Sequence, residues 1–194
     1  MKIIGPKSIS TGLSYLFLTL FIILTIKSIY MFFTFGVGYY NWTYSQNFLS
    51  EIVEVAKTPQ LVPYEFEVYF RFKYPFSNIQ MMMGFFTLRT FVFHTFQPLF
   101  FCLFFFFTYK VFKELSQQNI FTTKIIKLLS IFSVINILYA PLLYFIWSYI
   151  FNANIDLSLL MTCFAFLFLG VIIFFIIAFF KKGYELQSEN DLTI

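Results

Sequence analysis

The chain has 194 residues, of which 60% are hydrophobic, 25% are aromatic and only 11% are charged. This composition is far from that of a soluble domain, and several membrane spans in a chain of this length leave no room for a second folded domain. The formal net charge of +4 comes from lysines at the ends of apolar stretches, so we interpret it as a sign of membrane orientation and of contact with anionic lipid, not of direct nucleic-acid binding.

Four apolar stretches are each long enough to cross a bilayer, because a hydrocarbon core about 30 Å thick needs about 20 apolar residues in a helix. The stretches run over about Gly12–Phe35, Phe85–Phe112, Ile125–Phe151 and Leu157–Phe180. The sequence therefore predicts an all-α membrane protein, in which a bundle of four transmembrane helices forms a single membrane domain over residues 1–194.

The first stretch, Gly12–Phe35, follows Lys2 and Lys7, as the apolar core of a signal peptide would. Signal peptides, however, have an apolar core of about 7–15 residues followed by small residues at a cleavage site. This stretch is longer and ends in Phe33-Thr34-Phe35. We therefore expect an uncleaved membrane anchor.

An extracytoplasmic loop is expected over about residues 36–84. Within this loop Tyr64–Tyr74, bounded by Pro63 and Pro75, alternates aromatic or apolar residues with mostly charged ones. This alternation is typical of a β-strand with one aromatic face and one charged face. An isolated strand cannot bury an aromatic face, so we expect cover from a pairing strand near Glu51–Val55 or from the membrane surface.

Ionisable residues inside a membrane are costly and mark candidate functional sites. Lys27 lies toward the outer end of the first span, and His94 lies in the outer half of the second, on one helical face with Gln97. We hypothesise that Lys27, His94, Gln97 and Tyr144 converge on a polar pocket in the outer half of the bundle. The alternatives are that Lys27 extends to the membrane interface and that His94 only hydrogen-bonds between helices.

The third span carries small and polar residues three or four positions apart, namely Ser133, Asn136, Ala140, Tyr144 and Ser148. The outer half of the fourth span adds Ser158, Thr162 and Ala165. Such stripes let membrane helices pack closely and hydrogen-bond to one another. The connection near Phe151–Asp156 is very short, so we expect the third and fourth spans to be antiparallel neighbours.

The lysines that flank the predicted spans all fall on one side if the chain crosses the membrane four times: Lys2, Lys7, Lys110, Lys113, Lys124, Lys127, Lys181 and Lys182. Basic flanks stay in the cytoplasm. We therefore expect both termini, and the tail over residues 181–194, to be cytoplasmic. In the polar connection between the second and third spans, Ile120 and Phe121 form an apolar pair that could dock on the end of the bundle.

The C-terminal end of the chain carries a family likeness. Gly183, the pair Leu186-Gln187 and the ending Glu189–Ile194 directly follow the fourth span, and the inner connection adds Asn119, Phe121 and Lys124. These residues resemble the bacterial domain-of-unknown-function family numbered 2975. The resemblance implies a four-span protein of the bacterial cytoplasmic (inner) membrane without an assigned activity. Because members are often encoded beside a small helix-turn-helix regulator, it also implies such a regulator as a cytoplasmic partner.

Enzyme signatures are missing from the sequence. The chain has one histidine and no phosphate loop, nucleophile elbow or metal motif, so we expect neither an enzyme nor a bound cofactor or metal. None of the nine acidic residues lies inside a predicted span, which disfavours a proton-coupled transporter.

We therefore expect a sensory or regulatory membrane protein whose tail binds a cytoplasmic partner, because exposed chain ends can be captured by partner domains. The tail residues are Glu189, Asn190, Asp191, Leu192, Thr193 and Ile194. The alternative for the tail is that it is only solvated. Alternative functions are an immunity-type protein against a membrane-active peptide and a small transporter or channel subunit, and a homo-oligomer is compatible with each of these functions.

Overall fold

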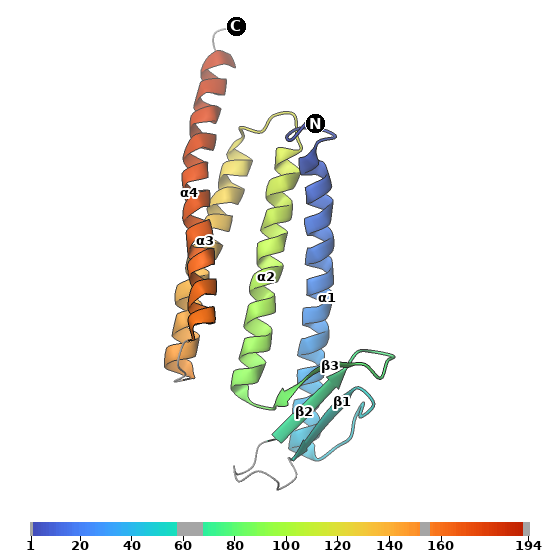
Figure 1. Cartoon of the computed structure of the whole chain (residues 1–194). Coiled ribbons are helices and arrows are strands. Elements are labelled where there is room, and N and C mark those ends of the chain that lie inside the picture. The colour runs from blue at the N-terminus through green and yellow to red at the C-terminus, as the bar shows by residue number, and fades with distance from the viewer. Residues whose placement is uncertain (1, 58–67, 152–155, 192–194) are drawn as a thin grey trace. The chain divides into compact units, whose positions relative to one another are not determined.

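A computed structural model of the chain describes residues 2–57, 68–151 and 156–191. Its elements in chain order (Figure 1) are α1 (Ile9–Tyr44), β1 (Val53–Lys57), β2 (Val68–Lys73), β3 (Gln80–Phe85), α2 (Leu88–Leu115), α3 (Thr123–Phe145), the π-helical turn η1 (Ile146–Ile150) and α4 (Leu157–Asp191). In these described ranges, four helices are long and apolar enough to cross a membrane. The predicted class, an all-α membrane protein with a small β element, is confirmed.

The chain forms two compact units. The first, here called the helical unit, consists of Met1–Ile22 and Phe100–Ile194, and the second, here called the sheet unit, is Ile23–Leu99. The helices α1 and α2 each contribute residues to both units. The units are therefore interleaved along the chain, and each is described by itself below.

In the sheet unit, three antiparallel strands pair in the order β1-β2-β3. The strand predicted over Tyr64–Tyr74 is confirmed from Val68 onward, and residues 64–67 lie outside the described residues. The partner strand expected near Glu51–Val55 is β1. The third strand, β3, was not predicted: Gln80–Gly84 fall in the expected outer loop, and this stretch lacks the apolar–polar alternation of Tyr64–Tyr74.

The register of the sheet gathers apolar side chains on one face. Phe70 lies opposite Val55 on β1, and Phe72 lies opposite Val53. Phe70 and Phe72 are 0% exposed, while Arg71 between them is exposed and lies 3.5 Å from the Glu54 carboxylate. The predicted alternation of an aromatic and a charged face is therefore confirmed for this part of the strand.

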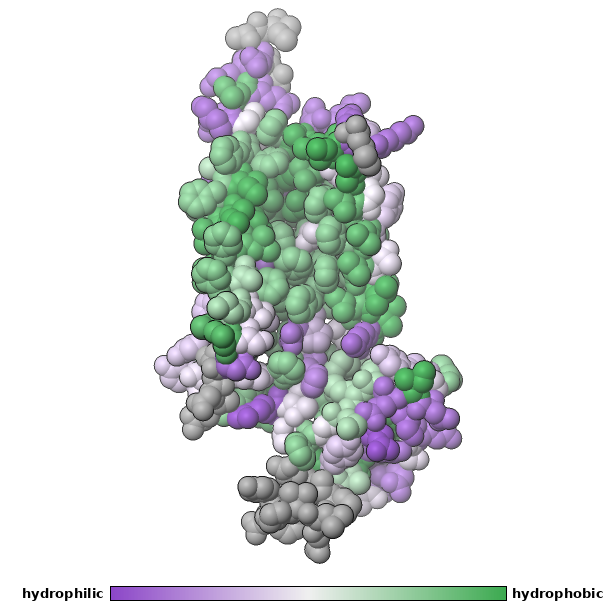
Figure 2. All heavy atoms as spheres, in the orientation of Figure 1, coloured by the Kyte–Doolittle hydropathy of each residue, from purple (hydrophilic) through white to green (hydrophobic). Residues whose placement is uncertain are grey.

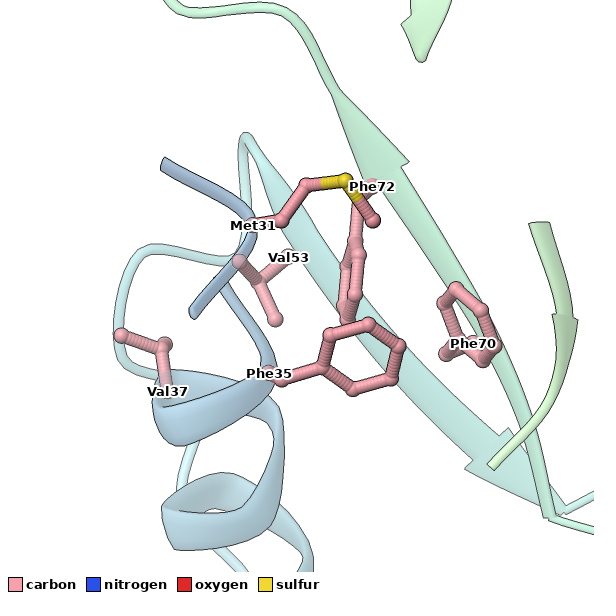
Figure 3. Packing of buried hydrophobic residues seen from close by; sticks show 6 residues of the cluster. All are labelled: Met31, Phe35, Val37, Val53, Phe70 and Phe72. Carbon is pink, nitrogen blue, oxygen red and sulfur yellow. The ribbon is translucent and has the colours of Figure 1, made fainter. Parts of the chain in front are cut away.

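The aromatic face of the sheet packs against α1 and not against a membrane surface. Figure 3 shows Phe35 of α1 directed at the two strand phenylalanines, with ring centroids 5.3 Å from Phe70 and 5.0 Å from Phe72. The buried cluster consists of Met31, Phe35, Val37, Val53, Phe70 and Phe72. The last turns of α1 are thus the cover that the strand needs.

Two helices extend beyond the membrane spans predicted within them. The first predicted span ends at Phe35 and the fourth at Phe180, whereas α1 continues to Tyr44 and α4 to Asp191. Apolar length locates the part of a helix that lies in hydrocarbon, but a helix ends where its backbone is capped. For α1 this happens at Ser45, whose backbone has a left-handed φ of 53°.

In the helical unit, parts of all four long helices pack into a bundle through aromatic contacts. Phe17 of α1 stacks on Phe112 of α2, with ring centroids 5.4 Å apart. Phe100 of α2 stacks on Tyr139 of α3 at 3.7 Å and meets Phe166 of α4 edge-on at 4.8 Å. Such ring pairs contribute about 0.5–1.5 kcal/mol each beyond the area that they bury.

The closest helix contact in the helical unit joins α3 to α4, which lie side by side and antiparallel as predicted (Figure 1). The Ser133 hydroxyl donates a hydrogen bond of 2.8 Å to the Gly170 carbonyl. A Cβ atom on Gly170 would lie only 2.7 Å from the Ile137 side chain. On α3 the predicted stripe therefore serves helix packing at Ser133. On α4 the contact residue is Gly170, while Ser158 and Ala165 of the predicted stripe are exposed.

The surface of α4 changes character along its length. Its spanning part exposes large apolar side chains, and the C-terminal end is polar (Figure 2). The exposed apolar residues include Phe164, Phe168, Phe174, Phe175 and Phe179. Hydrocarbon covers such a surface at low cost, so we place the membrane edge at the polarity change after Phe180.

Candidate functional site

The predicted polar pocket has three of its four residues in the sheet unit. Lys27 on α1 is exposed, whereas His94 and Gln97 on α2 are half-buried. The Lys27 ammonium and the His94 imidazole are near enough to interact electrostatically. The start of α2 is capped by Thr87, whose hydroxyl accepts from the Thr90 N–H at 3.2 Å.

The fourth pocket residue, Tyr144, lies in the helical unit near the end of α3, and its side chain is 51% exposed. The α3 stripe thus changes from buried at Asn136 to exposed at Tyr144. The Asn136 amide donates to the Phe132 carbonyl at 2.7 Å, while its oxygen is one of two buried side-chain atoms without a hydrogen-bond partner in the described part of the chain. The pocket of Lys27, His94, Gln97 and Tyr144 stays a prediction.

The predicted partner-binding tail is helical in its described part. Glu189, Asn190 and Asp191 form the end of α4, and Leu192, Thr193 and Ile194 lie outside the described residues. We call residues Lys181–Asp191, which follow the apolar part of α4, the α4 tail. No secondary structure was predicted for this segment; it is helical because a helix can continue from a preceding one without a new nucleus.

The base of the α4 tail is fixed by a contact with the connection between α2 and α3. The Phe121 ring lies against Gly183 so closely that a Cβ atom there would be 2.5 Å from two ring carbons. The same ring is 5.6 Å from the ring of Phe180. The predicted docking of the inner apolar pair is therefore confirmed for Phe121, and close approach explains why a glycine occupies position 183.

The connection that carries Phe121 is itself held in place. The Thr122 hydroxyl accepts from the Ile125 N–H at 3.3 Å and so caps α3. Lys124 forms an ion pair with Glu114 at the end of α2, and the Gly5 N–H donates to the Leu115 carbonyl at 2.9 Å. The connection between α2 and α3 is thus ordered. The α4 tail packs against it at Gly183.

The α4 tail exposes apolar and acidic side chains together. Tyr184 is 40% exposed and Leu186 is 49% exposed, and Glu189 is exposed as well. Glu185 lies 3.4 Å from Lys182 one turn earlier. The last turn of α4 has no basic residue, although the negative end of a helix dipole favours cations. A basic partner would therefore interact favourably with this end.

The α4 tail offers exposed apolar and acidic side chains through which it could bind another molecule. In the described ranges, no three His, Cys, Asp or Glu side chains are gathered as metal ligands. What sequence reasoning missed is the pairing of Phe121 with Gly183. Both residues belong to the family likeness, but they are far apart in sequence, and only the packing of α3 against α4 brings them together.

Comparison with known proteins agrees with the family likeness. The family model described as "Protein of unknown function (DUF2975)" matches residues 62–194. This range contains Phe121, Gly183 and the complete C-terminal ending, and it leaves α1 outside the match. No curated protein and no solved structure matches the chain.

Proposed function

The chain belongs to the DUF2975 family, whose function is unknown, and from this premise we propose that it is a non-enzymatic sensory or regulatory protein that acts through a cytoplasmic partner bound to the α4 tail. The proposed location is the cytoplasmic membrane of a bacterium, with both termini in the cytoplasm. The lysines at the span ends support this orientation, because basic flanks resist translocation.

The observation that carries the proposal is that the α4 tail is a helix anchored at its base. Phe121 packs on Gly183, while Tyr184 and Leu186 remain exposed farther along. A segment that is already helical loses less conformational freedom on binding than an unstructured one. A solvated end without a partner gains nothing from two exposed large apolar side chains and an anchored base.

The chemistry of the α4 tail favours a basic partner with an apolar groove. An amphipathic helix binds such a groove through side chains three or four positions apart. The acidic end of the tail, with Glu189 beyond Leu186, is complementary to a basic rim. A small helix-turn-helix regulator fits this description, because proteins that contact DNA phosphates carry lysines and arginines.

The test is binding of the full-length protein, held in lipid nanodiscs, to a purified small helix-turn-helix regulator, the kind of partner that the family likeness implies. We expect Leu186→Glu to weaken binding at least tenfold, which is about 1.4 kcal/mol and is typical of losing one buried anchor. The matched control is Gln187→Ala, a neighbouring position with a half-buried side chain, which should bind as the parent does. Equal affinity of the parent and Leu186→Glu would refute the proposal.

A further inference from the structure

An apolar groove of about 520 Å³ lies in the sheet unit. Its walls come from α1, from the connection between β3 and α2, and from the first turn of α2. Six of the lining residues are aromatic, namely Phe32, Phe35, Tyr39, Trp42, Phe86 and Phe91. Its volume falls in the range of about 300–1,000 Å³ that small-molecule sites occupy.

The groove is preformed by the core of the sheet unit. Phe35 forms part of the groove wall and also packs on Phe70 and Phe72, so the sheet holds its ring in place (Figure 3). Its ring also meets that of Phe91 edge-on at 5.3 Å. At the rim, Tyr39 is 65% exposed and Trp42 is 39% exposed. A rigid apolar wall with exposed amphipathic rings is suited to a ligand that has one apolar part.

The position of the groove along α1 relates it to the membrane surface. Counting about 20 residues of hydrocarbon-spanning helix from Gly12, where the first apolar stretch begins, places the far membrane edge near Phe32. The groove lies on the stretch that follows, from Phe32 to Trp42, which is about 15 Å of helix. It therefore begins where the hydrocarbon ends and leads into the headgroup region, where Trp and Tyr rings are favoured.

The charges along the groove are cationic. Arg89 directly follows the lining residue Leu88 and is exposed, and Lys27 precedes the groove on α1. The lining stretches of α1 and α2, residues 24–44 and 86–97, contain no Asp or Glu. This balance disfavours a cationic peptide and is complementary to an anionic head. The Thr87 hydroxyl, the polar group beside Phe86, already bonds Thr90.

We propose that this groove binds one acyl chain of an anionic phospholipid, whose phosphate lies at Arg89. The acyl chain replaces water and loosely packed lipid over the aromatic wall of the groove. Arg89 selects the anionic headgroup by charge. The site is independent of the α4 tail, because the groove residues all belong to the sheet unit.

The test uses the fluorescence of Trp42. The chain has two tryptophans, so Trp147→Phe leaves Trp42 as the reporter in the full-length protein. This protein is placed in nanodiscs that contain a minor fraction of phosphatidylglycerol or phosphatidylcholine with brominated acyl chains, at equal bromine content. Bromine quenches tryptophan on contact. We expect about fivefold enrichment of the anionic lipid at Trp42, the equivalent of about 1 kcal/mol for one basic residue near anionic lipid.

Two further substitutions in this reporter protein test the two halves of the site. Gly36→Leu fills the groove without backbone conflict, because a Cβ there meets nothing within 4 Å, and it should abolish the preferential quenching. Gly12→Leu is the matched control, since Gly12 lies on the same helix with an equally open Cβ position. Arg89→Gln should make the two brominated lipids quench equally.

Equal quenching by the two lipids in the reporter protein would overturn the proposal, as would unchanged preference in Gly36→Leu. If Gly36→Leu instead converts an oligomer into a monomer by light scattering and leaves the lipid preference intact, the groove is covered by a second copy and the proposal is wrong.

Discussion

The contact between Phe121 and Gly183 predicts that Gly183→Ala destabilises the parent protein but stabilises a protein in which Phe121 is replaced by alanine. Alanine favours an α-helix over glycine by about 1 kcal/mol, so Gly183→Ala should stabilise α4 where space allows. In the parent protein the new Cβ would lie 2.5 Å from the Phe121 ring. Displacing a packed ring costs about 1–3 kcal/mol, so we expect a net loss of about 0–2 kcal/mol of unfolding free energy.

In a Phe121→Ala background the ring is absent and only the helix preference remains. Gly183→Ala should then stabilise the protein by about 1 kcal/mol. The coupling free energy between the two positions, about 1–3 kcal/mol, is the quantity that a double-mutant cycle isolates. It is measured by reversible unfolding of the four variants in mixed micelles of increasing SDS fraction, followed by tryptophan fluorescence.

The control for this cycle is Gly12→Ala, because a Cβ at Gly12 meets nothing within 4 Å. It should stabilise the parent and the Phe121→Ala protein alike, by about 1 kcal/mol. If Gly183→Ala has the same effect in both backgrounds, the ring does not rest on the glycine and the anchored-tail argument is refuted.

Three further predictions concern other parts of the chain. Deleting Glu189–Ile194 should leave membrane insertion and stability unchanged within about 0.5 kcal/mol and weaken partner binding; a truncated protein that fails to accumulate would show that these residues are a structural cap. Phe70→Asp should cost more than about 4 kcal/mol, because it places a carboxylate in the buried face of the sheet, whereas Arg71→Asp should cost about 1 kcal/mol, since it loses an exposed ion pair and faces Glu54 across the strands. Similar expression and thermal stability for the two variants would contradict the observed register. Reporter fusions at Ile194 and near Gln60 should report opposite sides of the membrane, and equal signals from both would rule out four crossings.

The fold could be predicted where one physical requirement dominates. The thickness of the hydrocarbon core locates the four spans, and strict alternation locates the strand around Phe70 and Phe72. The strand Gln80–Phe85 was not predicted because its three consecutive methionines break the alternation by which a half-buried strand is found. The extension of α1 to Tyr44 was missed because apolar length does not report helix capping.

The candidate site was predictable only in part. Phe121 was expected to dock on the end of the bundle, and Gly183 stood out in the family likeness, yet nothing in their spacing pairs them. That pairing depends on how α3 and α4 align, which is set at distant positions such as Ser133 and Gly170. The aromatic groove was missed because Phe32 and Phe91 lie inside two different predicted spans, and nothing in their spacing shows that their rings meet, 6.1 Å apart.

The hydrogen bond from Ser133 to the Gly170 carbonyl has a consequence for how the protein enters the bilayer. On its own, α3 would present the Ser133 hydroxyl and the Asn136 amide to hydrocarbon, where polar groups are costly. In contact with α4, Ser133 is 1% exposed and Asn136 is 0% exposed. The two helices are joined by only a few residues, so partitioning as a hairpin hides these groups from the start. We therefore expect α3 and α4 to leave the translocation machinery as a pair, and a chain truncated before α4 to insert α3 poorly.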